Sequence, residues 1–205
     1  MYKPKRKSLI IELSNRLCSI LPVFFWLFLI FGFEEPIMAI VTICSALLHE
    51  MGHIGYIMIA KRINPDIRGV VSGFRIRSGG NLSYDEEIRT YLSGPAVNVL
   101  LFVLCSFLGL ISEDLFFMAA FINLATALSN LLPIDGYDGY GAIMAMINKH
   151  ELGDSAVRCL TYLSTALVFI FCIFSLYLLD RRGEGFWIFA VLFFSMLKCI
   201  KKSID

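Results

Sequence analysis

The sequence has little charge. Asp, Glu, Lys and Arg make up 17% of its 205 residues, whereas a soluble domain usually carries about 25%. This shortage, together with 58% hydrophobic residues, excludes a soluble single-core enzyme and a disordered chain. The six cysteines contain no Cys-x-x-Cys pair, which argues against a disulfide-rich secreted domain. The formal net charge is only +1, so nucleic acid is not expected as a partner.

The abundant apolar residues gather in blocks of about 17–25 residues, the length that a helix needs to cross a bilayer. They predict an all-α polytopic membrane protein, a single domain over residues 1–205 with about six transmembrane helices. The six blocks run approximately over 17–33, 37–60, 91–111, 115–132, 157–179 and 185–200. No small-x-small cleavage site follows the first block, which favours an uncleaved anchor over a signal peptide.

The distribution of Lys and Arg predicts the orientation. If the N-terminus is cytoplasmic, six spans return the C-terminus to the cytoplasm as well. Of the 18 Lys and Arg residues, all except Arg181 and Arg182 then lie in cytoplasmic segments or at their borders. The opposite orientation would reverse this bias. We therefore expect a multi-pass protein of the cell membrane, with both termini in the cytoplasm.

The one sizeable loop, about 61–90, contains a strand-like pattern. Residues 72–77 alternate apolar and basic side chains, 78–81 form a turn signal, and 82–84 alternate again. These features predict a small cytoplasmic β-hairpin at the membrane surface. An irregular basic loop in contact with lipid headgroups is the alternative.

Two of the three histidines, His49 and His53, lie inside the second apolar block, with Glu50 beside the first of them. An ionisable residue deep in a membrane helix costs at least about 2.5–3.5 kcal/mol on insertion scales, so it indicates function. Side chains at i and i+4 share a helix face, so two imidazoles can hold one metal ion. A glutamate one position along can act as the base on a zinc-bound water. Packing alone is a poor explanation for three polar residues in so apolar a segment.

Two imidazoles leave zinc short of ligands, and a third should come from another span. The fourth block ends in a Pro/Gly-rich turn that bears Asp135 and Asp138. Non-helical backbone at membrane depth is tolerated where it is buried in protein or lines a wet cavity, so a carboxylate there suits the third ligand. An ordinary interfacial turn with two solvated acids is the alternative.

At this point the sequence resembles the site-2 protease family of intramembrane zinc metalloproteases, peptidase family M50. Three motifs match in order over about residues 37–140. They are His-Glu-x-x-His at 49–53, Gly-Pro-x-x-Asn at 94–98, and Asn-x-x-Pro-x-x-x-x-Asp-Gly at 130–139. The resemblance implies a three-helix catalytic core over 37–140, with accessory spans at about 17–33, 157–179 and 185–200.

The resemblance also assigns roles to individual residues. It implies one Zn²⁺ per chain held by His49, His53 and Asp138, with Glu50 as the catalytic base. Asn130 would lie near the substrate or the developing oxyanion. Gly94 and Pro95 would shape helix packing, and Asn98 would hold a buried hydrogen bond between helices.

The sequence departs from the family pattern near the third ligand. Gly136 and Tyr137 stand where the family often has proline and leucine, and a second Asp-Gly pair begins at Asp135. The ligand could therefore have shifted by three residues, although Asp138 is favoured. No segment resembles the PDZ or CBS domains of larger relatives.

The resulting expectation is an intramembrane zinc endopeptidase that cleaves a membrane protein or membrane-embedded peptide near its cytosolic end. Small size and analogy with the family suggest a bacterial cytoplasmic membrane. The alternative is a metal-binding membrane protein without proteolytic activity, either a transporter or an inactive relative that binds membrane helices. Such a protein would not need a glutamate beside the histidine pair.

Overall fold

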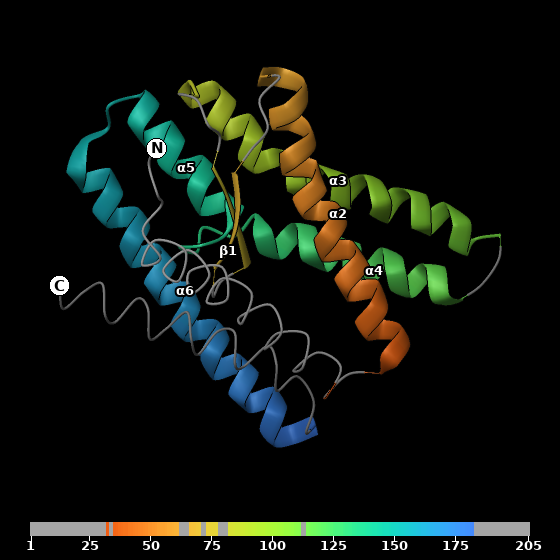
Figure 1. Ribbon diagram of the computed structural model, residues 1–205. Helices are drawn as coiled ribbons and strands as arrows, with labels where there is room; N and C mark the ends of the chain where they lie inside the picture. Colours follow the sequence, from red (N-terminus) through yellow and green to blue (C-terminus); the bar gives the residue numbers. More distant parts are fainter. Residues whose placement is uncertain are drawn as a thin grey trace, which may run out of the picture.

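The structure is a computed structural model. It describes residues 35–61, 66–70, 73–77, 82–111 and 114–182, together with Gly32. The elements in chain order are α2 (Pro36–Lys61), β1 (Asp66–Val70), β2 (Gly73–Arg77), α3 (Tyr84–Gly109), α4 (Asp114–Asn130), α5 (Asp138–Lys149) and α6 (Gly153–Arg182). Figure 1 shows α3 and α4 side by side, with α2 crossing them and α5 leading into the long α6.

Three of the described helices are long and apolar enough to cross a membrane: Pro36–Ala60 of α2, Tyr84–Gly109 of α3 and Gly153–Tyr177 of α6. The fourth predicted span corresponds to α4, a shorter apolar helix. The remaining two predicted spans, 17–33 and 185–200, lie outside the described residues apart from Gly32. The fold is therefore that of a helical membrane protein, as expected, whereas the number of six spans stays a prediction.

The predicted pairing of the β-hairpin is wrong. Residues 73–77 do form a strand, but the partner of this strand is 66–70 and not 82–84. The two strands are antiparallel, with Asp66 opposite Arg77 and Val70 opposite Gly73. Of the two strands, β2 contacts α2.

The reason for the error lies at the start of α3. Ser83-Tyr84-Asp85-Glu86 is a helix-capping sequence, in which the backbone N–H and the hydroxyl of Ser83 both donate to the Glu86 carboxylate at 2.8 and 2.9 Å. Three acidic residues in the first turn also suit the positive end of the helix dipole. The helix consequently begins seven residues before the apolar block that predicted it.

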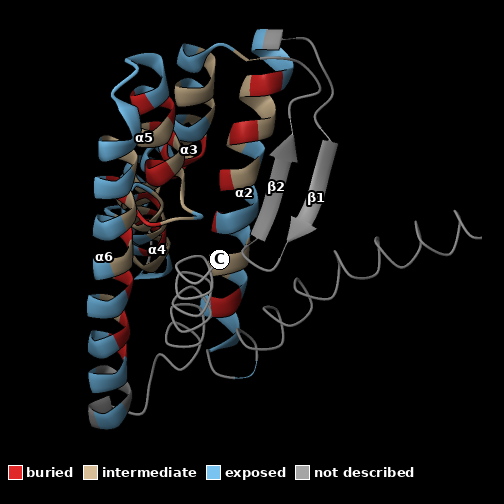
Figure 2. Ribbon diagram, turned by 90° about the vertical axis from the view of Figure 1, so that its left-hand side faces the viewer, coloured by how far each residue is buried: buried red, intermediate tan, exposed pale blue. Residues whose placement is uncertain are grey.

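Helix α3 is the centre of the described packing. It contacts α2, α4 and α5, while α2 also contacts α4, and α5 contacts α6. In Figure 2 the buried residues lie on the inward sides of these helices, and α6 carries a narrow buried stripe along one side. Much of the remaining helix surface is apolar and exposed, as expected for side chains that face lipid.

The contact between α5 and α6 is apolar. Tyr140, Ile147 and Leu160 form its buried centre, and Val157 is among the partly buried residues around it. This packing fixes α5, whose first residue is Asp138, against the neighbouring spanning helix.

Candidate metal centre

The two histidines of α2 face inward from the middle of the helix. His49 and His53 are 5% and 6% exposed, and Ser45, one turn earlier on the same face, is also buried. Spacing by four residues places all three side chains in one row. The Nε2 atoms of the two imidazoles lie 3.2 Å apart.

Asp138 completes a cluster with the two histidines. Its Oδ2 lies 2.9 Å from His49 Nε2 and 3.2 Å from His53 Nε2. The sequence predicts that Asp138 lies in a turn. In the structure it is instead the first residue of α5. The next residue, Gly139, lets the first turn of α5 approach α4 closely, because a Cβ there would overlap the carbonyl of Leu131.

The other aspartate of this segment, Asp135, is hydrogen-bonded to α6 through its backbone. The backbone N–H of Asp135 donates to the hydroxyl of Ser164 on α6 at 2.8 Å. Between the two aspartates, Gly136 adopts a φ of 103°, a conformation that glycine tolerates best. Among the described residues, the cluster of possible metal ligands contains Asp138 and not Asp135.

Both imidazoles also use their second nitrogen. The Nδ1–H of His49 donates to Asn98 Oδ1 at 2.6 Å, and the Nδ1–H of His53 donates to the carbonyl oxygen of Thr90 at 2.7 Å. Both acceptors belong to α3. Since Nδ1 carries the proton in each neutral ring, the Nε2 lone pairs are free to face Asp138.

The contact of α3 with the histidines depends on a glycine. Thr90, Gly94 and Asn98 follow one another at four-residue intervals along α3, opposite the row on α2. A Cβ at Gly94 would lie 2.6 Å from His53 Cε1 and 2.8 Å from His49 Cε1, closer than real Cβ contacts allow. The absence of a side chain at this position therefore leaves room for both imidazole rings.

The three converging atoms suit a small divalent cation. Two imidazole nitrogens and one carboxylate oxygen are typical zinc ligands, and tetrahedral coordination at about 2.0–2.1 Å would separate neighbouring ligand atoms by about 3.3 Å. The observed separations of 2.9–3.2 Å are close to this value. Three protein ligands leave one coordination position open, which is the pattern of catalytic zinc sites.

The protonation state of Asp138 is consistent with this role. Burial by itself raises the pKa of the carboxyl group, but hydrogen bonds from His49 and His53, formed when a proton rather than a cation lies on Nε2, hold the pKa below its ordinary value. At neutral pH the group is therefore a carboxylate, the form that binds a cation.

Glu50 and Asn130 are the other two predicted site residues. Glu50 is partly buried and lies close enough to His49, His53 and Asp138 for electrostatic interaction with them. Asn130 ends α4, where its side-chain amide donates to the carbonyl of Thr126 at 2.9 Å. This bond satisfies one donor within α4 and assigns no contact with substrate.

Sequence reasoning missed the residues that orient the histidines. The expected buried hydrogen bond of Asn98 between helices is present, but the sequence did not show that one of its partners is His49. Thr90 orients His53 through its backbone carbonyl, so the identity of its side chain could not predict this role. The regular spacing of Ser45, His49 and His53 on one helix was the available clue.

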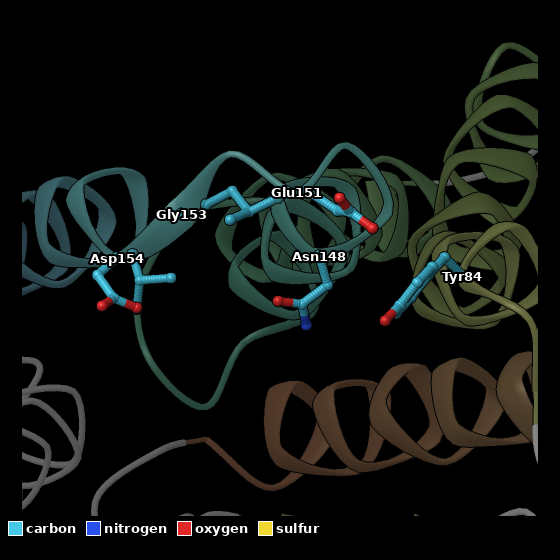
Figure 3. A pocket seen from close by; sticks show the side chains of 7 residues that line it. Tyr84, Asn148, Glu151, Gly153 and Asp154 are labelled. Atoms are coloured by element: carbon cyan, nitrogen blue, oxygen red, sulfur yellow. The ribbon is translucent and has the colours of Figure 1, made fainter.

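A surface pocket of about 270 Å³ lies away from these residues. Figure 3 shows its walls, which come from the start of α3, the end of α5 and the start of α6. The lining residues are Tyr84, Ile147, Asn148, Glu151, Gly153, Asp154 and Val157. None of them belongs to the His/His/Asp cluster.

The fold and the cluster together define a class: a helical membrane protein with a possible metal centre between α2 and α5, backed by α3. This is a site-2-protease-like fold. The structure is similar to the Site-2 Protease from Methanocaldococcus jannaschii, with a TM-score of 0.64 and 18% identity, over 91% of this chain and 88% of that one. No protein-family model matches the chain, and no curated protein sequence matches it.

Proposed function

We propose that the protein is an intramembrane zinc endopeptidase. The observation that carries the proposal is the convergence of His49 Nε2, His53 Nε2 and Asp138 Oδ2 within 3.2 Å of one another, inside a helical membrane protein. Glu50 follows the first histidine in the order that zinc proteases use. The likeness in fold to a site-2 protease supports the same class.

In this proposal His49, His53 and Asp138 hold one Zn²⁺. The bound ion supplies Lewis-acid activation of water and of the scissile carbonyl. Glu50 accepts a proton from the attacking water as its oxygen bonds to the carbonyl carbon. Glu50 then delivers that proton to the leaving amide nitrogen as the C–N bond breaks. The products are a carboxylic acid and an amine, which ionise to a carboxylate and an ammonium group, and Glu50 returns to its starting form.

The proposed substrate is a membrane protein or a membrane-embedded peptide, cut near its cytosolic end. Lys61 ends α2 eight residues beyond His53, about 12 Å along the helix axis. In the predicted orientation this end is cytoplasmic, so water and substrate reach the centre from that side. An extended substrate could pair with an edge of the β1–β2 sheet, whose strand β2 contacts α2. Removing both strands, residues 66–77, should then reduce cleavage and leave bound zinc unchanged.

The decisive experiment compares wild type with Glu50→Gln, both purified in detergent. Zinc per chain is measured alongside cleavage of a pool of synthetic single-span peptides, followed by mass spectrometry. We expect about one zinc in both proteins, with cleavage reduced by at least about 10³-fold in the variant. A wild-type protein that is folded but binds no zinc would refute the proposal, as would cleavage that does not depend on Glu50.

The alternative function, a metal-binding membrane protein without proteolytic activity, predicts a different result. Such a protein would keep zinc in both forms and cut no peptide in either. His150→Ala is a matched control, because His150 is exposed at the end of α5 and is not part of the cluster. It should leave both zinc content and cleavage unchanged.

A further inference from the structure

A buried polar cluster adjoins the proposed metal centre on the side away from Lys61. It consists of Ser45 on α2, Asn98 on α3 and Asn123 on α4, all buried, with Asn98 fully inaccessible to solvent. Their hydrogen bonds join three apolar helices at one level. Buried amides in such surroundings are costly unless their donors and acceptors are paired. The hydrogen bonds of each amide therefore show which of its atoms, oxygen or nitrogen, faces each neighbour.

The hydrogen bonds of this cluster have a direction. Asn123 Nδ2 donates to the carbonyl of Ala119 on its own helix at 2.9 Å, so Asn123 presents Oδ1 to its neighbours. Asn98 Nδ2 lies 2.9 Å from that oxygen and 3.0 Å from the hydroxyl of Ser45. The hydroxyl itself donates to Asn123 Oδ1 at 3.0 Å. With its amide nitrogen engaged in this way, Asn98 can present only Oδ1 to His49.

We propose that Asn98 is a positioning residue of the metal centre. Its oxygen accepts Nδ1–H of His49, keeps Nε2 of that ring unprotonated, and aims it at Asp138 and His53. The cluster with Ser45 and Asn123 holds the amide in the required orientation. Metal affinity is thereby coupled to the packing of α4 against α2 and α3. This inference rests on the proposed zinc site and names the residue that tunes it.

The test separates hydrogen-bond acceptance by Asn98 from its other bonds. Asn98→Ala removes the acceptor, whereas Asn98→Asp keeps an oxygen for the histidine. Both variants lose the amide donors, so both should melt at a lower temperature than wild type. Zinc affinity is measured by competition with a fluorescent chelator on the full chain in detergent. Loss of an outer hydrogen-bond partner typically weakens metal binding 10–100-fold.

We expect Asn98→Ala to bind zinc about 10–100-fold more weakly than wild type, and Asn98→Asp to recover to within about threefold. Co²⁺ provides a second readout, because rotation of His49 changes the visible absorption of each bound ion. The band should shift in the alanine variant and not in the aspartate variant. Ser175→Ala is the matched control, since Ser175 is a buried residue of α6 that does not belong to the cluster.

Asn123→Ala keeps the inference testable if Asn98→Ala does not fold. This change leaves the contact between Asn98 and His49 in place but removes one of the groups that orient the amide, so a smaller loss of zinc affinity is expected. Equal zinc affinity in wild type, Asn98→Ala and Asn123→Ala would overturn the inference, as would an equal loss in the alanine and aspartate variants of Asn98. Failure of wild type itself to bind zinc would instead refute the proposed function.

Discussion

Two parts of the protein are held together by different means. At the crossing of α2, α3 and α4, buried side chains are polar and form hydrogen bonds, with Asn98 at the centre. Between α5 and α6 the buried side chains are apolar, with Ile147 and Leu160 in contact. The first arrangement fixes the direction in which individual atoms point, whereas the second mainly fills space. Precise placement of ligand atoms requires the first kind.

The two parts meet at Asp138. This residue contacts both histidines of the polar region, yet it belongs to α5, which packs against α3 and, through apolar side chains, against α6. The comparison therefore separates metal affinity from stability. Changes in the polar region should alter the affinity for zinc, and changes in the apolar region should alter mainly the free energy of unfolding.

The largest expected effect is the loss of zinc on replacing Asp138 by Ala. Removing one of three protein ligands, and the only charged one, leaves two imidazoles that cannot retain the ion during purification. Zinc per chain should fall from about one to near zero. Asp135→Ala is the control, because Asp135 engages α6 through its backbone N–H and should keep full zinc. The reverse pattern would move the third ligand to Asp135.

Gly94→Ala should lower both the affinity for zinc and the free energy of unfolding. The added Cβ would overlap His53 and crowd His49, so the rings or the helices must shift. Overpacking of this kind costs about 1–3 kcal/mol of stability, and displaced ligands should weaken zinc binding at least tenfold. Gly55→Ala is a matched control on α2, since a Cβ there meets nothing within 4 Å. Chelator competition and thermal unfolding measure the two effects, and similar behaviour of both variants would contradict the role of Gly94.

Much of this arrangement could be predicted from the sequence because hydrophobic blocks and helical spacing are local properties. The block at 37–60 predicted α2, and the spacing of His49 and His53 placed both on one face. The start of α3 was missed because its first turns are polar, although Ser83 and Glu86 carried a capping signal. The contribution of Thr90 could not be predicted, since a backbone carbonyl is present at every residue. Only the packing of α3 on α2 selects that one.

Leu160→Ala tests the apolar region alone. Leu160 is 5% exposed and packs in the centre of the α5–α6 contact. Truncation of a buried leucine to alanine costs about 2–5 kcal/mol of stability. We expect a value of about 2 kcal/mol here, because lipid is itself apolar. Thermal unfolding should show this loss while zinc per folded chain stays near one. A parallel loss of zinc affinity would mean that α5–α6 packing also sets the position of Asp138.

The smallest effect should come from Lys149→Gln. The ammonium group of Lys149 lies 2.6 Å from an Asp85 carboxylate oxygen, linking the end of α5 to the start of α3, but the two side chains are 39% and 55% exposed. Water and salt screen such a pair, and ordering two flexible side chains offsets much of the attraction. We expect a decrease in melting temperature several times smaller than that of Leu160→Ala, diminishing further at high salt, with zinc affinity unchanged. A decrease comparable to that of Leu160→Ala would show that α5 depends on this charged contact with α3 as much as on its apolar packing against α6.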